Sequence, residues 1–227
     1  MVVRRKSDDG VKLVVIPAPN IEHVAIPIRG IAPLCISRFS KKAELMDKMA
    51  EGSTAKNKRV RKARDYAAEV EDAKHVSLDG WEGINASAFR RGAIDACRLC
   101  GFQMVMAKMT IFAVEDGYSA ESTPLVRIYG PGAEMFTAPV RNASGGADIR
   151  ARPIYKKWGC MLNFRYDRDQ FEASSVLNLV ARVGMQIGVG EGRPFSKESA
   201  GIGLGMFQIV PTDQLDEFRE EFGIPAG

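Results

Sequence analysis

A glycine-rich segment near the end of the chain constrains the fold more than any other feature. Residues 188–210 read GVGEGRPFSKESAGIGLGMFQIV, with a G-x-G-x-G cluster on each side of a polar tip. Glycine loses more conformational freedom on folding than any other residue, so a concentration of this kind needs a structural reason. One reason is the close approach of a second backbone. The glycines are Gly188, Gly190, Gly192, Gly201, Gly203 and Gly205.

Two helices are predicted outside this segment. Apolar residues at helical spacing cover 85–100, where Asn85 or Ser87 is the expected N-cap and Gly101 the expected C′ residue. A second apolar stripe covers 174–184, with Ser174 or Ser175 as the cap and Gly184 as the end.

Strand patterns alternate with these helices. We expect strands over 24–39, 108–115, 158–167 and 206–210. Pro27, Gly30 and Pro33 interrupt the first of them, which suggests bulges or a sheet edge. The order is β-α-β-β-α-β, which is the ferredoxin-like or RRM-like order of an α+β fold. Two helices on one face of a four-stranded sheet would bury both apolar stripes.

The remaining segments are interpreted as additions to a single domain covering 1–227. Residues 41–83 and 117–157 are insertions into the core, and 212–227 form an acidic C-terminal helix and tail. Residues 51–80 are polar and charge-rich, which favours a mobile insertion with a helix from about 57 to 70. Residues 141–152 have no periodicity and are expected to form a flexible loop.

Positive charge is concentrated in parts of the chain. The formal net charge is only +4, so its distribution carries the argument. The run KNKRVRKAR (56–64) holds no acid, and residues 141–157 hold one acid against five cations. Two basic segments favour contact with nucleic-acid phosphates, for which the candidates are Lys56, Lys58, Arg59, Arg61, Lys62, Arg141, Arg150 and Arg152. In the glycine-rich segment, Arg193 and Lys197 at the tip are further candidates.

A ferredoxin-like order with a glycine-rich loop between the second helix and the last strand resembles the RAMP superfamily of CRISPR effector complexes. The resemblance rests first on residues 188–205, which lead into the strand-like sequence FQIV. Residues 117–157 are the counterpart of a β-hairpin called the "thumb", and residues 41–83 are the counterpart of the "fingers". The tip at 193–200 is longer than in the short form of the loop. The phrases IAPLCISRFSKK and GVGEGRP also resemble reading frames of phages and prophages.

The resemblance implies a non-catalytic RNA-binding backbone subunit. Such subunits polymerise head-to-tail along a guide RNA and present it to a complementary target strand. Carried over to this chain, Arg38, Lys41 and Lys42 would hold the guide backbone, and Arg141, Arg150 and Arg152 would belong to the thumb. The glycine loop would let the strand run close to the sheet, with Arg193 and Lys197 as phosphate contacts.

Other chemistry finds little support in the sequence. The glycine segment matches neither GxxxxGK[ST] nor GxGxxG, so no nucleotide cofactor is expected. Cys97 and Cys100 form a CxxC at a helix end, where core packing is favoured over a redox or metal role, and no metal site is expected. Neither His23 nor His75 lies near the glycine segment in sequence, so we expect no enzyme.

Two other functions stay open. A phage protein that binds or anneals single-stranded DNA would need a similar basic surface, and a structural phage protein would bind no nucleic acid. Trp81, Trp158 and Tyr155 are candidates for base stacking as well as for the core. No apolar run approaches about 20 residues and the N-terminus lacks a signal region, so we expect no membrane contact and a place in the bacterial cytoplasm.

Overall fold

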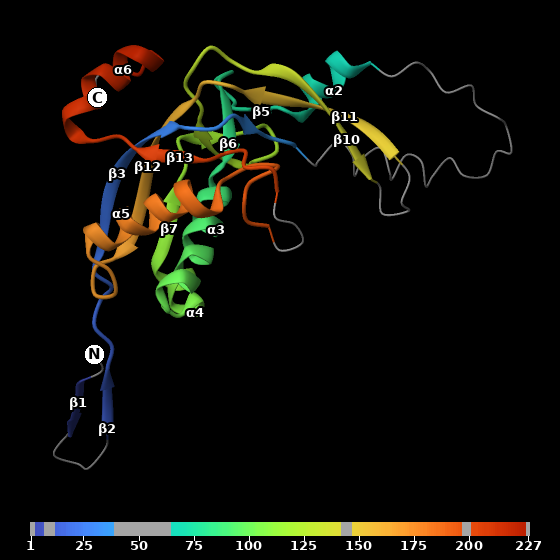
Figure 1. The fold of residues 1–227 in the computed structure, drawn as a ribbon. Helices are drawn as coiled ribbons and strands as arrows, with labels where there is room; N and C mark the ends of the chain where they lie inside the picture. The colour runs from blue at the N-terminus through green and yellow to red at the C-terminus, as the bar shows by residue number, and fades with distance from the viewer. Residues whose placement is uncertain (1–2, 7–11, 39–64, 142–146, 197–200, 226–227) are drawn as a thin grey trace, which may run out of the picture.

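The structure is a computed structural model that describes residues 3–6, 12–38, 65–141, 147–196 and 201–225 (Figure 1). It contains α-helices and antiparallel sheets. The expected helix at 57–70 therefore falls mostly outside the described residues. None of the helices in these ranges is long and apolar enough to cross a membrane.

A four-stranded sheet forms the centre of the molecule. Its strands lie in the order β13 (Phe207–Ile209), β3 (Ile21–Gly30), β12 (Gly159–Asp167) and β7 (Ile111–Val114). Every neighbouring pair is antiparallel, with Leu162 opposite Ile26 in the central pair. Strands expected near 158–167 and 206–210 are therefore confirmed.

Two helices cover one face of this sheet, α3 (Ala86–Ala96) and α5 (Ala173–Arg182) (Figure 1). Successive strand residues point to opposite faces, so alternate positions of each strand face these helices. Ile26 and Ile28 of β3, together with Leu162 and Phe164 of β12, are at most 1 % exposed and belong to the main core. Both predicted apolar stripes are buried as expected.

The ends of these helices follow the sequence signals only in part. Asn85 caps α3, because its Oδ1 accepts a hydrogen bond of 2.9 Å from the backbone N of Ser87. The 3₁₀ turn η1 (Cys97–Cys100) then leads to Gly101 at a φ of 69°, as predicted. For α5 the expected serine cap is wrong: the N-cap is Glu172, which makes no side-chain cap bond.

Gly184 does not end the helical segment, because α5 continues directly into the short π-helix η2 (Val183–Ile187). A Cβ on Gly184 would lie 2.1 Å from the backbone oxygen of Phe207. Glycine is therefore needed there for the close approach of β13, and the prediction of a helix stop is wrong.

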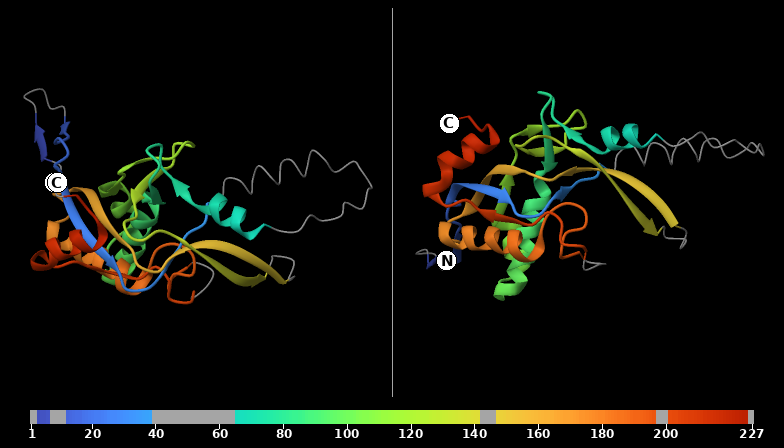
Figure 2. Two further views of the ribbon diagram at one scale, coloured as in Figure 1. Left: turned by 90° about the horizontal axis from the view of Figure 1, so that it is seen from above. Right: turned by 45° about the horizontal axis from the view of Figure 1, so that its top comes forward.

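A C-terminal helix lies against the other face of the sheet, as the right-hand view of Figure 2 shows. The 3₁₀ turn η3 (Thr212–Gln214) and α6 (Leu215–Phe222) match the acidic helix expected from the sequence. Phe218 is fully buried against Gly159, whose added Cβ would lie 2.7 Å from its ring. Glu221 joins Arg29 of β3 at 2.9 Å.

Residues 24–39 do not form one strand, contrary to expectation. β3 ends at Gly30, where a Cβ would lie 2.2 Å from Trp158 Nε1, and the chain turns before the short strand β4 (Leu34–Cys35). β3 is also central, and the suggestion of an edge is wrong. Pro27 faces Val210 on the side of β13, because its oxygen accepts a hydrogen bond of 2.9 Å from Val210 N. β13 has already ended at Ile209, so the missing N–H of Pro27 removes no hydrogen bond between the two strands.

The strand expected at 108–115 is shorter, because its first residues belong to α4 (Met104–Thr110) and only β7 is extended. The sequence MVMAKMT is rich in residues with good helix propensity. Thr110 Oγ1 donates to the carbonyl of Met106 at 2.7 Å and so closes the last turn.

The loop expected at 141–152 is wrong for Arg141 and for residues 147–152, which belong to strands, whereas 142–146 lie outside the described residues. Strands β10 (Glu134–Arg141) and β11 (Ala147–Tyr155) form a long antiparallel hairpin that extends away from the central sheet (Figure 2). β11 also pairs with β4, with Ile154 opposite Cys35. Most of the pairing is between β10 and β11 themselves, and Pro139 and Pro153 interrupt the alternation that would have indicated these two strands.

The insertions also contribute strands to a second four-stranded sheet. β5 (His75–Val76), β6 (Glu82–Asn85), β9 (Pro124–Arg127) and β8 (Gly117–Tyr118) pair in that order, and α2 (Tyr66–Ala73) packs on β11. Residues 65–80 are therefore regular structure, which corrects the expectation of a mobile segment for that part. β1 (Val3–Lys6) pairs with β2 (Lys12–Val15).

Candidate functional site

The glycine-rich segment, called the glycine loop below, connects η2 to β13. All six of its glycines have positive φ, between 62° and 84°. Side chains with a Cβ rarely adopt this conformation. The concentration of glycine therefore follows first from the path of the loop's own backbone.

The close approach expected from the sequence exists, and the approaching backbone is the chain's own. An added Cβ would lie 1.8 Å from Val189 O at Gly205 and 2.3 Å from Cys35 O at Gly190. Gly205 N donates to Pro33 O at 2.8 Å, and Glu191 N donates to Cys35 O at 2.8 Å. The loop is thus hydrogen-bonded to the segment around β4.

A cavity of about 330 Å³ lies between the glycine loop and α3. We call it the α3–loop cavity. The 36–37 segment after β4, His75 of β5, the first three turns of α3 with the residues before them, and loop residues 187–193 line it. Of the nucleic-acid-binding residues predicted from the sequence, three that the structure describes line this cavity: Gly188, Gly190 and Arg193.

Four arginines from four separate segments surround this cavity. Arg91 (on α3) and Arg193 (on the glycine loop) line it. Arg152 of β11 lies 3.1 Å from the lining residue Glu191, and Arg38 directly follows the lining residue Ser37. The fold therefore brings predicted residues Arg38, Arg152 and Arg193 to one region.

Each of these arginines has a partner within the chain. Arg38 binds Glu121 at 2.7 Å, Arg91 binds Asp95 at 3.0 Å and Arg152 binds Glu191 at 3.1 Å. Arg193 Nη1 donates to Gly190 O at 2.9 Å. Glu121 and Glu191 are 44 % and 49 % exposed, so these pairs are accessible to solvent and individually weak.

Two polar groups in the cavity wall are unusual. Burial, and then the charge of Arg38, lowers the pKa of His75, which favours the neutral imidazole. Its Nδ1 and the Oδ1 of Asp95 are buried, and neither has a hydrogen-bond partner within the described residues. A buried polar atom without a partner is costly, so such atoms point to a ligand or to water.

The structure leaves other predicted residues untested. Arg150 lies half-buried on β11, and the side chain of Arg141 is outside the described residues. Gly192, Gly201, Gly203 and Gly205 belong to the loop without lining the cavity. Outside the described ranges lie Lys41, Lys42, Lys56, Lys58, Arg59, Arg61, Lys62 and Lys197.

The candidate stacking residues are mostly unavailable. Trp158 is fully buried and Tyr155 is 1 % exposed, so both belong to the core. Trp81 is half-buried, with the guanidinium of Arg127 at 5.9 Å from its ring. The stacking role is therefore wrong for the first two.

Sequence reasoning missed Arg91, Asp95 and His75. One signal was present: Asp95 interrupts the apolar stripe of α3, four residues after Arg91, where an i,i+4 ion pair is possible. His75 reaches the cavity only through the pairing of β5 with β6, which local patterns do not reveal.

Core packing is confirmed for Cys97 and is wrong for Cys100. Cys97 is fully buried and Cys100 is exposed; both are free thiols. Burial raises the pKa of Cys97, which is the opposite of what a redox thiol requires. Within the described residues, no group of three or more His, Cys, Asp or Glu side chains is arranged to hold a metal ion.

No model of a known protein family matches this sequence, and no curated protein matches it either.

Two glycines of the loop provide a matched test of its backbone. Gly205→Ala should lower the free energy of unfolding by about 3 kcal/mol or more, because the added Cβ overlaps Val189 O and the backbone has a left-handed conformation. Gly203→Ala should cost only about 1–2 kcal/mol, because nothing lies within 4 Å of its added Cβ. Denaturant unfolding of both variants measures the difference, and equal costs would contradict the docked loop.

The environment of His75 predicts a pH dependence of stability. The folded pKa is lowered, so below about pH 6.5 the unfolded chain binds more protons than the folded one and stability falls. His75→Asn removes the titrating group. Lowering the pH from 7.5 to 5.5 should therefore lower the free energy of unfolding of the wild type relative to that of His75→Asn. A difference that is the same at both pH values would show that His75 titrates normally.

Proposed function

We propose that this protein is a non-catalytic RNA-binding subunit that holds single-stranded RNA along the rim of the α3–loop cavity. The observation that carries the proposal is the convergence of Arg38, Arg91, Arg152 and Arg193 from four segments beside the glycine loop. Guanidinium groups bind phosphate oxygens in a bidentate manner, and a row of them suits a phosphate backbone.

The arrangement of the core supports membership in the RAMP type. Numbering the core strands in chain order, the sheet order is 4-1-3-2 with every pair antiparallel, as a ferredoxin-like fold requires. The glycine loop precedes the fourth of these strands, which is its position in the family that the sequence resembles.

The ion pairs around the cavity orient the arginines before RNA binds. An exposed pair contributes little to stability, so a phosphate can displace the carboxylate at small cost. Glu121 and Glu191 are each about half exposed and have room to turn toward solvent. In this proposal the acids position the guanidinium groups and, by competing with phosphate, also limit their affinity for RNA.

The β10–β11 hairpin takes the role of the thumb. It belongs to the insertion 117–157, projects from the body of the protein and carries Arg150 and Arg152 (Figure 2). Through Arg152 and Glu191 it contacts the glycine loop at its base, so RNA on the cavity rim would pass beside it.

Copies of the chain would assemble head-to-tail along the RNA as a guide, open to a complementary target strand. Heterologous contacts that do not close produce open filaments, which suit a linear ligand. The exposed acids of the C-terminal segment offer one side of such a contact, with the basic run 56–64 of a neighbour as the other. These acids are Asp213, Asp216, Glu217 and Glu220.

Salt dependence of RNA binding tests the arginine contacts. The double variant Arg152→Ala/Arg193→Ala should weaken binding of single-stranded RNA and flatten its logarithmic salt slope by about 0.7 per lost phosphate contact. Glu191→Gln should act in the opposite direction and tighten binding, because it releases Arg152. Fluorescence anisotropy over a salt series measures both.

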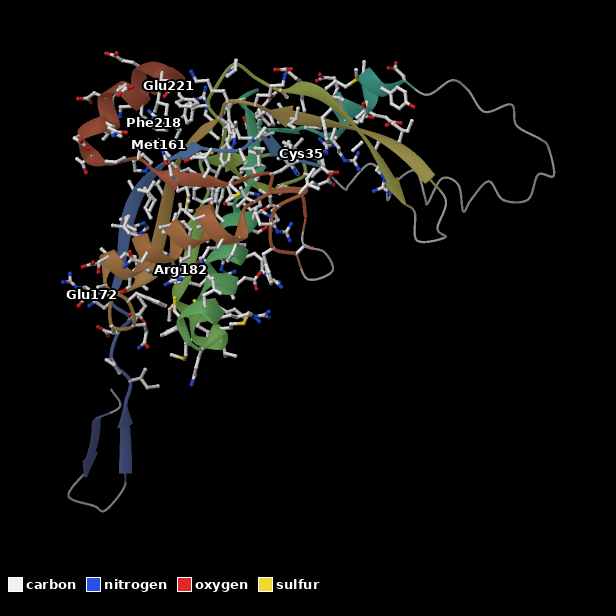
Figure 3. All side chains as sticks on the ribbon, in the orientation of Figure 1. Cys35, Met161, Glu172, Arg182, Phe218 and Glu221 are labelled. Carbon is white, nitrogen blue, oxygen red and sulfur yellow. The ribbon has the colours of Figure 1, made fainter. Side chains whose placement is uncertain are left out.

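Arg168→Ala is the matched control. Arg168 is also an ion-paired arginine, with Glu22. Glu172, whose charge acts on Arg168, lies far from Cys35 (Figure 3). An equal loss in the control and the double variant would overturn the interface. Preference for DNA in competition would favour the annealing function, and no binding of either nucleic acid would favour a structural protein.

A further inference from the structure

The α3–loop cavity contains a carboxylate that the phosphate contacts do not use. Asp95 lies on α3, is 8 % exposed and lines the cavity. Its Oδ2 accepts a hydrogen bond of 3.0 Å from Arg91 Nε, while its Oδ1 is buried without a partner within the described residues. A phosphate cannot satisfy this oxygen, because two anions repel. The missing partner is a hydrogen-bond donor.

Arg91 supplies the complementary group at the same place. Its side chain is 64 % exposed, and a guanidinium has five N–H donors, of which Nε is used by Asp95. The pair therefore offers a free acceptor on Asp95 next to donors on Arg91. The Watson–Crick edge of a nucleobase presents the matching pattern, an N–H beside a carbonyl or ring acceptor.

The rest of the wall suits a flat, largely apolar ring. Ile36, Ile84, Ile187 and Val189 line the cavity together with the polar groups. Its volume of about 330 Å³ lies in the range of small-molecule pockets, roughly 300–1,000 Å³. His75 Nδ1, the second buried polar atom without a partner, adds another hydrogen-bonding group to the wall.

We propose that the α3–loop cavity receives a single nucleobase turned out of the bound strand, with a base N–H donating to Asp95 Oδ1 and Arg91 donating to the neighbouring base acceptor. This inference rests on the proposed function, since it assumes that a single strand lies on the cavity rim. It adds a contact to a base where the proposed function invokes only phosphates. A cation is the poorer occupant, because within the described residues no cluster of three acidic, histidine or cysteine ligands exists.

The test compares two oligomers of equal length, one of ordinary RNA and one whose sugar-phosphate chain carries no bases. The measured quantity is the ratio of their dissociation constants, which cancels the phosphate contribution that both share. A hydrogen bond to a charged partner predicts a preference of about tenfold for the base-bearing oligomer in the wild type. In Asp95→Ala the ratio should fall toward one, because the base N–H loses its acceptor; any phosphate contact that the released Arg91 gains is shared by both oligomers and cancels in the ratio.

Two further variants keep the test decisive. Ser87 is exposed and lines the cavity, so Ser87→Phe should obstruct it without disturbing the core, and should lower the ratio even if Asp95→Ala destabilises the fold. Asp79→Ala removes an exposed carboxylate that does not line the cavity, and its ratio should stay at the wild-type value.

The outcomes separate the two proposals. Salt-dependent binding with the same ratio in the wild type, Asp95→Ala and Ser87→Phe would overturn the base site and leave the RNA interface standing. Failure of both oligomers to bind would overturn the proposed function and the base site together.

Discussion

The docking of the glycine loop on the β4 segment is the constraint on which the candidate site depends. Backbone hydrogen bonds join Gly205 to Pro33 and Glu191 to Cys35, across more than 150 residues of sequence. These contacts are possible only because the loop residues lack a Cβ where the backbones meet and adopt positive φ. They fix the loop at one end of the central sheet, beside the first turns of α3.

This placement creates both the cavity and its electrostatics. The loop supplies Arg193 and Glu191, α3 supplies Arg91 and Asp95, and β11 reaches the same region because it pairs with β4. Each arginine is held by an acid or a carbonyl, which orders the guanidinium groups at little cost in a solvent-accessible region. Because acids are interspersed with the arginines, the site is not a simple basic patch. We interpret this mixture of charges as selectivity for a strand that offers both phosphates and a base.

The sequence predicted the core better than it predicted the site. Helices at 85–100 and 174–184 and the strands at 158–167 and 206–210 follow from local periodicity, and their existence is confirmed. Local patterns missed the two strands of the β10–β11 hairpin, because Pro139 and Pro153 interrupt their alternation, although the family resemblance implied a hairpin within 117–157. The break after Gly30 was missed because it depends on Trp158, which is distant in sequence. Within the site, Arg193 and the glycines were visible as a motif. Asp95 and His75 acquire their roles only when α3, β5 and the loop come together, and no local pattern encodes that meeting.

The most direct measurement is to map where RNA touches the protein. Single-stranded RNA containing a photoreactive thionucleotide is irradiated with the protein, and the cross-linked peptides are identified by mass spectrometry. The account predicts adducts on the segments that form the cavity and its rim: 36–38, 84–95 and 187–193. Adducts confined to α6 or to the end of the sheet that carries Glu22 and Arg168, or the absence of any adduct, would contradict it.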